Sequence, residues 1–300
     1  MRAIFKMDGR SVLHLQGEGA KALLKRLLCG NVRSMTEGTI VFSPMLNMQG
    51  GTMDNVMVYC DHENSYWLIV HECSREKDLR HIRRELTPDV TVEDLHDMLC
   101  LYAVISEGGN LTLSGAPVYF AAQTDHLGAD SWLACVQRED APAFETDMAQ
   151  RGGVLYSQAE MDTMMMENGV PAYGRELDDT INPLEVGLGK TVHLERPGFI
   201  GREALVAAGV PRRGVIGLLL TGEGAKRGQN VIHRDKDVGV VTSVCFSPRM
   251  QSWIALALVE KPYQDVGRKL RVENGEELID AYVSALPFRK PEEEPAEESN

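Results

Sequence analysis

The strand patterns of the C-terminal third place the strongest constraint on the fold of this chain. After Arg213, short apolar runs follow one another at close spacing. Several short strands at such spacing are typical of a sheet that closes on itself. The sequence therefore predicts a small β-barrel over residues 213–288. Its clearest strand runs are GVIGLLLTG, VGVVTSVCF, SWIALALVE, KLRVENG and ELIDAYVSAL.

The first 89 residues combine strand and helix patterns. RSVLHLQG alternates like a strand, and EGAKALLKRLLCGNV places four leucines at helical spacing before Gly30. The run from Gly38 to Glu72 predicts three strands, with turns at 48–51 and 61–65. A helix in CSREKDLRHIRREL completes a mixed α+β domain, for which we expect the bounds 1–89.

A second α+β domain, related to the first, is expected over residues 90–212. LCLYAVI, VYFAAQ and SWLACVQ are interpreted as strands, and DAPAFETDMAQRGG as a helix with Asp140 at its N-cap. Residues 289–300 carry five glutamates and no apolar side chain larger than alanine, which predicts a disordered acidic tail.

Composition excludes several classes of protein. No apolar run reaches the length of a membrane span or forms a signal-peptide core, so we expect a cytoplasmic protein without membrane contact. The net charge of −13 argues against nucleic acid as a partner, because phosphate neutralisation requires clustered Lys and Arg. Six cysteines occur singly, which predicts reduced, mostly buried thiols and no metal site.

Three stretches invite a ligand interpretation. GEGAKA at 17–22 lacks the βαβ context of a dinucleotide loop, and GLGKT at 187–191 lacks the upstream glycine of a phosphate-binding loop, so both are interpreted as turns. The triplet Met164–Met166 lies in a helix predicted to start near Ser157. These methionines either fill the core or line a flat ligand pocket.

Asp54 in LNMQGGTMDNVMVY is the most informative single residue. A Gly-Gly turn delivers this carboxylate to the start of an apolar strand. Taken alone, such an acid is either a turn residue that bonds its own backbone or a surface residue at a strand end. The alternative is a buried acid that the strand holds rigidly and that takes part in catalysis.

Several long, collinear motifs resemble the aminomethyltransferase family, which comprises the T-protein of the glycine cleavage system and relatives that move one-carbon units to or from tetrahydrofolate. The chain is identified as a shortened, divergent member. The motifs are MLNMQGGTMDNVMVY, SREKDL (74–79), ENGVPAYGRELDDTINPLEVGLGKTV (167–192), FIGREAL (199–205) and GVVTSVCFSPRMQSWIALALV (239–259).

The resemblance implies an α+β fold in which two related α+β domains and a C-terminal β-barrel surround a central folate channel, with tetrahydrofolate as cofactor. Asp54 matches the family's active-site aspartate, which would assist proton transfer at a folate nitrogen and stabilise positive charge. Phe42 stands where the family often has tyrosine, and His71 where it usually has asparagine. YGRELDDTINPLE is either structural or functional. The expected folate contacts are Phe42, Val56, His71, Met165, Glu167 and Tyr173.

Two polar anchors of the family's pterin site are absent. The Gly-Tyr-Thr-Gly-Glu segment is replaced by ADSWLACVQREDAP, and Met165 stands where an arginine is expected. Leaving pterin polar groups unpaired would be costly. Glu160, Asp162 or Glu167 could replace the acid; alternatively a second subunit completes the pocket, or the ligand is not a standard folate.

These observations favour a tetrahydrofolate-dependent one-carbon transferase, either aminomethyltransferase-like or a demethylase. Its donor would be a small or carrier-bound methyl or aminomethyl compound, and a partner subunit is possible. The alternatives are a non-catalytic folate-binding accessory protein of the iron–sulfur maintenance type and a degenerate scaffold. Accessory relatives carry a cysteine where this chain has Phe199.

Overall fold

The chain forms two compact units in the computed structural model, which describes residues 2–106, 113, 115–124, 131–275 and 277–290. Most of the tail predicted to be disordered lies outside the described residues. Helix α4 (Gln158–Glu167) runs from the first unit into the second. The first unit holds 1–161, 177–183 and 188–209, and the second holds the remaining described residues.

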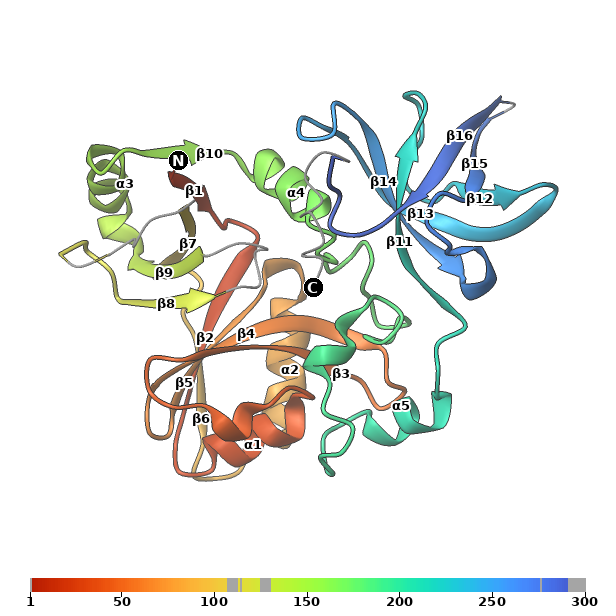
Figure 1. The fold of residues 1–300 in the computed structure, drawn as a ribbon. Coiled ribbons are helices and arrows are strands. Elements are labelled where there is room, and N and C mark those ends of the chain that lie inside the picture. The colour runs from red at the N-terminus through yellow and green to blue at the C-terminus, as the bar shows by residue number, and fades with distance from the viewer. Residues whose placement is uncertain (1, 107–112, 114, 125–130, 276, 291–300) are drawn as a thin grey trace, which may run out of the picture. The chain divides into compact units, whose positions relative to one another are not determined.

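An antiparallel five-stranded sheet, in the order β3-β4-β5-β2-β6, forms one half of the first unit (Figure 1). Helices α1 and α2, both predicted from the sequence, cover one face of it. The strands are β2 Arg10–Gln16, β3 Ile40–Leu46, β4 Thr52–His62, β5 Ser65–His71 and β6 Thr91–Asp94. The helical segments are α1 Ala20–Leu27, η1 Val32–Ser34, η2 Glu72–Ser74 and α2 Arg75–Glu85.

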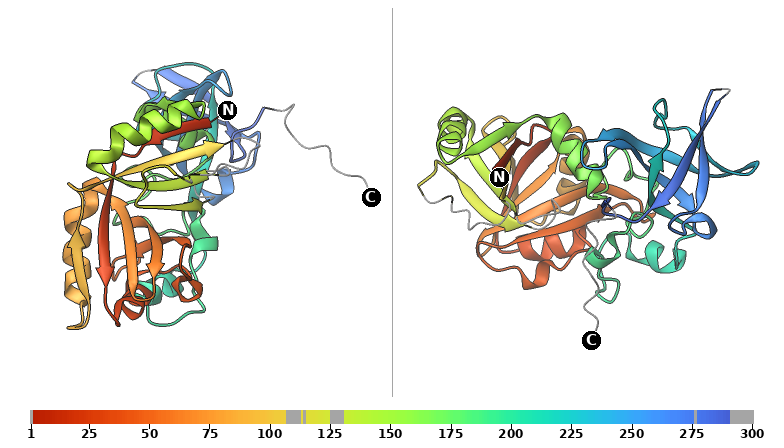
Figure 2. Two further views of the ribbon diagram at one scale, coloured as in Figure 1. Left: turned by 90° about the vertical axis from the view of Figure 1, so that its left-hand side faces the viewer. Right: turned by 45° about the horizontal axis from the view of Figure 1, so that its top comes forward.

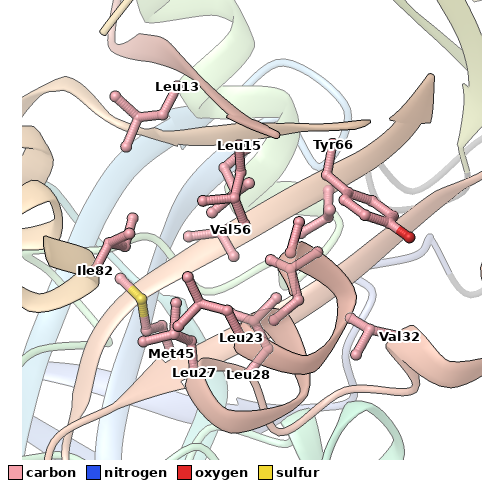
Figure 3. Close-up of a cluster of buried hydrophobic side chains, with 14 of the residues drawn as sticks. Leu13, Leu15, Leu23, Leu27, Leu28, Val32, Met45, Val56, Tyr66 and Ile82 are labelled. Carbon is pink, nitrogen blue, oxygen red and sulfur yellow. The ribbon is translucent and has the colours of Figure 1, made fainter. Parts of the chain in front are cut away.

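A hydrophobic core fills the space between this sheet and its helices. The leucines of α1 face Leu15 and Val56 of the sheet (Figure 3). Because strand residues alternate between faces, Val56 and Val58 of β4 point into this core. Each fully buried leucine or valine contributes about 1.5–3 kcal/mol, so the core accounts for much of the stability of the unit.

The second sheet of the first unit has the order β10-β1-β7-β9-β8, with β1 parallel to β10 and all other pairs antiparallel. Helix α3 packs on one face through Phe144 and Met148 (Figure 2). The strands are β1 Arg2–Lys6, β7 Leu99–Ser106, β8 Phe120–Thr124, β9 Ser131–Gln137 and β10 Gly153–Tyr156. The helical segments are η3 Arg138–Asp140 and α3 Ala141–Gln150.

Strand pairing crosses the domain boundary predicted at residues 89 and 90. Strand β1 belongs to the second sheet because it pairs with β7, while β6 lies beyond residue 89 and pairs with β2 of the first sheet. Aromatic side chains join the sheets, since Tyr59 stacks on Phe120 with ring centroids 4.1 Å apart and Trp67 contacts the same ring. The two sheets of the first unit are therefore interdependent.

The second unit contains the predicted barrel, which closes in the order β11-β14-β13-β12-β15-β16. All of its pairs are antiparallel. The five predicted strands are present, and β12 is an additional strand of four residues. The strands are β11 Arg213–Leu220, β12 Asn230–His233, β13 Lys236–Ser247, β14 Ser252–Glu260, β15 Lys269–Asn274 and β16 Glu277–Ser284, with η5 at Lys261–Tyr263.

Two further observations bear on the sequence expectations. All six cysteines are free, and four of them are buried. No helix within the described part of the chain is long and apolar enough to cross a membrane. The remaining helical segments, η4 Leu188–Thr191 and α5 Arg202–Ala208, belong to the first unit.

Arg196 caps the C-terminal end of α1. Its guanidinium donates to the carbonyl oxygens of Lys25 (2.5 Å) and Leu28. We expect Arg196→Met to lower the free energy of unfolding by about 1–3 kcal/mol, because the substitution leaves partly buried carbonyls without a charged donor. Urea denaturation measures this loss. The matched control is Arg26→Met, which breaks an exposed pair with Glu85 and should cost less than about 1 kcal/mol. Equal losses in the two variants would contradict the capping role.

Candidate active site

A tightly held turn sets the start of β4. The Asn47 side-chain oxygen accepts the backbone N–H groups of Gln49 (2.9 Å) and Gly51 (3.0 Å), and Gly50 has a φ of 83°. A Cβ on Gly51 would lie 1.8 Å from the carbonyl oxygen of Asp179, so only glycine fits there. The Gly-Gly pair therefore permits close contact with the segment around Asp179.

That segment, residues 177–183, belongs to the family-like run YGRELDDTINPLE. The backbone N–H of Thr52 donates to the carbonyl oxygens of Asp178 and Ile181, both at 3.0 Å, and the Thr52 hydroxyl donates to Ile181 at 2.9 Å. Lys77 of α2 pairs with Asp179 at 2.9 Å. This part of the run thus has a structural role, because it fixes the strand that carries Asp54.

Asp54 is fully buried and its carboxylate receives three N–H donors. Oδ1 lies 2.5 Å from His71 Nδ1 and accepts the backbone N–H of Asn55 at 2.6 Å. Oδ2 accepts the backbone N–H of His71 at 2.9 Å. Three directed hydrogen bonds hold the carboxylate in a single orientation. Asp54 is therefore neither a surface residue nor a simple turn residue.

Arg10 of β2 and His71 of β5 surround the carboxylate. Arg10 Nη1 donates to the carbonyl oxygen of Asn55 at 3.0 Å and lies 3.3 Å from His71 Nδ1. Because that nitrogen donates its proton to Asp54, its contact with Arg10 is electrostatic. Burial and the Arg10 charge lower the pKa of His71, and the Asp54 hydrogen bond opposes them only in part. The imidazole is therefore neutral at pH 7.

Asp54 and Asp78, the fourth residue of α2, have pKa values displaced in opposite directions. Burial would raise the pKa of Asp54, but the hydrogen bonds from His71 and Asp78 and the Arg10 charge bring it well below the usual range. Burial and the Asp54 charge raise the pKa of Asp78 to about 10. The α2 dipole favours an ionised Asp78 by about 0.3–1 kcal/mol. Two carboxylates about 4 Å apart repel by about 4 kcal/mol at an effective dielectric constant of about 20, so repulsion prevails.

The structure brings together Asp54 and His71, which the sequence proposed separately, and adds Arg10 and Asp78, which it missed. Phe42 is buried on β3. Val56, also expected to contact folate, is buried in the core beneath α1 and α2, on the same face of β4 as Asp54.

The other expected folate contacts lie in the second unit. Met165 and Tyr173 are half-buried there. Glu167 is buried, and its Oε1 accepts the Ser247 hydroxyl at 2.5 Å and the Arg249 N–H at 3.2 Å. Its Oε2 pairs with the Arg249 side chain at 3.4 Å. Glu167 thus holds the turn that joins β13 and β14.

The two other candidate pterin acids also have local partners. Glu160 accepts the N–H and hydroxyl groups of Ser157 and forms the capping box of α4. Asp162 forms an ion pair with Arg175. Of the three methionines at 164–166, Met166 is a core residue, because it packs in a cluster with Ile254, Leu256 and Phe288.

Phe199 occupies the place of the accessory-type cysteine. Its ring is buried, and the Arg196 guanidinium lies 5.1 Å from its centroid. A packed aromatic ring offers no thiol chemistry at this position. Within the described residues, no group of three His, Cys, Asp or Glu side chains could hold a metal ion.

The fold and this site define a class of α+β proteins in which two sheets precede a closed six-stranded barrel and a buried carboxylate stands at the start of a strand. Residues 2–106 match the model of the GCVT N-terminal domain, and residues 213–290 match the glycine cleavage T-protein C-terminal barrel domain. The chain belongs to the glycine cleavage T-protein family of aminomethyltransferases.

Individual relatives agree with this assignment. The aminomethyltransferase of Synechococcus elongatus is 31% identical over 315 residues, covering 95% of this chain and 84% of the relative. That of Bacillus pumilus is 28% identical, covering 96% and 87%. The crystal structure of glycine cleavage system aminomethyltransferase T from Bartonella henselae has a TM-score of 0.85 at 19% identity, covering 96% of this chain and 86% of that one, and it shows the fold.

Proposed function

We propose that this protein is a tetrahydrofolate-dependent one-carbon transferase with Asp54 as its catalytic carboxylate. The observation that carries the proposal is the buried, ionised Asp54, held by three N–H donors at the strand start where the family motif falls. Burying an ion is costly unless its bonds compensate, and a buried carboxylate with a strongly displaced pKa is a candidate for a functional group.

The polar groups beside Asp54 fit a reduced folate. The side-chain oxygen of Asn55 is buried and has no hydrogen-bond donor within the described residues, so it can accept an N–H of a ligand. His71 and Phe42 would supply a polar and an aromatic contact from the first unit. When bound, tetrahydrofolate would supply the nitrogen that accepts the one-carbon unit.

The residues of the site have separate tasks. Asp54 holds a fixed negative charge in surroundings of low dielectric constant, where it stabilises positive charge and can accept a proton. His71 orients that carboxylate through its Nδ1–H and its backbone N–H. Arg10 balances the buried charge, since its guanidinium lies against both His71 and the Asn55 carbonyl.

The donor is proposed to be a methyl or aminomethyl compound, either small or bound to a lipoyl carrier. Several relatives are named aminomethyltransferases, which supports an aminomethyl donor. Folate binding without turnover would instead indicate an accessory protein, and neither binding nor turnover would indicate a degenerate scaffold. The packed Phe199 ring gives no support to the accessory alternative.

Anaerobic calorimetric titration with tetrahydrofolate tests the proposal. We expect saturable binding with a Kd of about 1 μM or lower, which corresponds to about −8 kcal/mol. Asn55→Ala should weaken binding about tenfold, because one hydrogen bond to a buried acceptor is lost. Asp61→Asn, at the far end of the same strand, is the control and should bind like the wild type. Failure to saturate at millimolar tetrahydrofolate would contradict the proposal.

A further inference from the structure

Asp78 is a buried acid to which the proposed reaction assigns no task. Its side chain is fully buried and receives no N–H donor within the described part of the chain, and its side-chain hydrogen-bond neighbours are the Ser74 hydroxyl and Asp54. It makes a side-chain hydrogen bond with Asp54, the other fully buried carboxyl of the cluster. Two carboxyl groups can share a hydrogen bond only when one of them carries a proton.

The distribution of donors shows which carboxyl group is charged. Asp54 receives all three N–H donors of the cluster, from Asn55 and His71. The cations of α2 nearest to Asp78 are paired elsewhere, since Lys77 lies 2.9 Å from Asp179 and Arg75 lies 2.8 Å from Asp94. With three N–H donors at Asp54 against the single Ser74 hydroxyl at Asp78, the arrangement stabilises an anion at Asp54 more than one at Asp78.

We propose that Asp78 retains its proton at neutral pH and donates it to the Asp54 carboxylate, which makes Asp78 a positioning residue for Asp54. The positioning role of Asp78 in catalysis rests on the proposed function, whereas the protonation of Asp78 does not. The cluster then contains one cation, Arg10, one anion, Asp54, a neutral imidazole and a neutral acid, so its buried charge is balanced.

A neutral donor beside Asp54 has a chemical consequence. A hydrogen bond to the charged form of a carboxylate lowers its affinity for protons. Asp78 therefore keeps Asp54 ionised at lower pH and supplies a fourth directed bond to it. Without this donor, Asp54 would take up a proton at a higher pH. Any reaction that needs the Asp54 charge would then be lost at a higher pH.

Carbon-13 NMR of the side-chain carboxyl groups, in protein labelled at aspartate, tests the protonation directly. The Asp78 signal is assigned by its absence in Asp78→Asn. We expect a chemical shift typical of a carboxylic acid from about pH 6 to 8, with ionisation only in the alkaline range. A carboxylate shift at pH 7 would overturn the proposal. Because this measurement needs neither folate nor turnover, its failure and that of the proposed function are distinguishable.

The pH dependence of the free energy of unfolding is a second, independent test of the protonation of Asp78. The titratable or charged groups around Asp78 and its partner Asp54 are Arg10 from β2, His71 from β5, Cys73 from η2 and Lys77 from α2. In a narrow window around pH 7.5, about one unit from each reference pKa, unfolded histidine is largely neutral and unfolded cysteine largely keeps its proton. Arg10 remains charged and Asp54 ionised throughout. Asp78 is then the group in this cluster whose protonation differs between the two states.

The sign of this dependence follows from the raised pKa of Asp78. The folded chain holds the proton and the unfolded chain does not, so stability falls as pH rises. The ratio of the wild-type unfolding constant to that of Asp78→Asn should rise tenfold per pH unit, because the wild type releases one additional proton on unfolding. Parallel curves for the two proteins would overturn the proposal.

Turnover of Asp78 variants distinguishes a role of Asp78 in positioning Asp54 from a role in packing alone. Asp78→Asn retains a neutral N–H donor to Asp54, whereas Asp78→Ala removes it. We expect Asp78→Asn to retain at least ten times the kcat of Asp78→Ala, and the acid limb of the pH profile to move to higher pH in the alanine variant. Equal kcat values with an unmoved acid limb would assign Asp78 to packing alone. If the alanine variant does not fold, the NMR and stability measurements decide the matter.

Discussion

Replacing Asp54 with asparagine should reduce turnover about a hundredfold or more and leave the fold intact, in line with the loss of a general acid–base group. The amide is nearly isosteric, and its oxygen can still accept the His71 Nδ1–H. What is lost is the negative charge, together with the acceptor of the His71 backbone N–H. Initial rates of one-carbon transfer to tetrahydrofolate, with aminomethyl-lipoyl carrier and methylamine donors, measure the effect.

Asp61→Asn is the matched control, because it makes the same substitution at the other, solvent-exposed end of β4. It should retain the wild-type rate. Circular dichroism and thermal unfolding would establish that both variants are folded. Wild-type turnover in Asp54→Asn would exclude the catalytic role of this carboxylate, and an equal loss in both variants would point to a general effect on the strand.

Replacing Gly51 with alanine should lower the free energy of unfolding by about 3 kcal/mol, at the upper end of the usual cost of overpacking. The added methyl group would lie 1.8 Å from the Asp179 carbonyl oxygen and 2.4 Å from its carbon, so one of the two backbone segments must move. Displacing residues 177–183 would also disturb both hydrogen bonds from the Thr52 N–H. Urea denaturation with an unchanged m-value measures the loss.

Gly9→Ala provides the control for this experiment. A Cβ at Gly9 meets no atom within 4 Å, and this glycine belongs to the same unit. Its substitution should change the free energy of unfolding by less than about 1 kcal/mol. A Gly51→Ala protein as stable as Gly9→Ala would show that the contact with Asp179 does not hold the strand start in place.

Local patterns predicted those elements of the fold that depend on local sequence. The barrel strands alternate or carry continuous apolar runs, and all five predicted strands are present. The missed strands are β1, with five residues, and β6, β10 and β12, with four each, too few to show a clear period. The membership of β1 in the second sheet depends on pairing with residues about a hundred positions away, which no local pattern reveals.

The candidate site was predicted only in part for the same reason. Asp54 and His71 were proposed from motifs, but their 2.5 Å contact joins two strands and is not visible in the sequence. Asp78 lay in the SREKDL motif without a sign that it faces a second carboxyl group. Glu167 was proposed as a ligand because its type fits a pterin, whereas its partners Ser247 and Arg249 come from a turn eighty residues later.

The pairing of β1 across the two sheets also bears on how the chain is made. On the ribosome, the first sheet can form once β6, ending at Asp94, has emerged. Strand β1 is synthesised before all others, yet it lies between β7 and β10 and must wait for residues 153–156 before both its edges are paired. Its apolar side chains, Ile4 and Phe5, stay without their final contacts during that interval. Strand β1 is therefore exposed longest among the strands of the first unit before both its edges are paired, and it needs shielding from aggregation during that time.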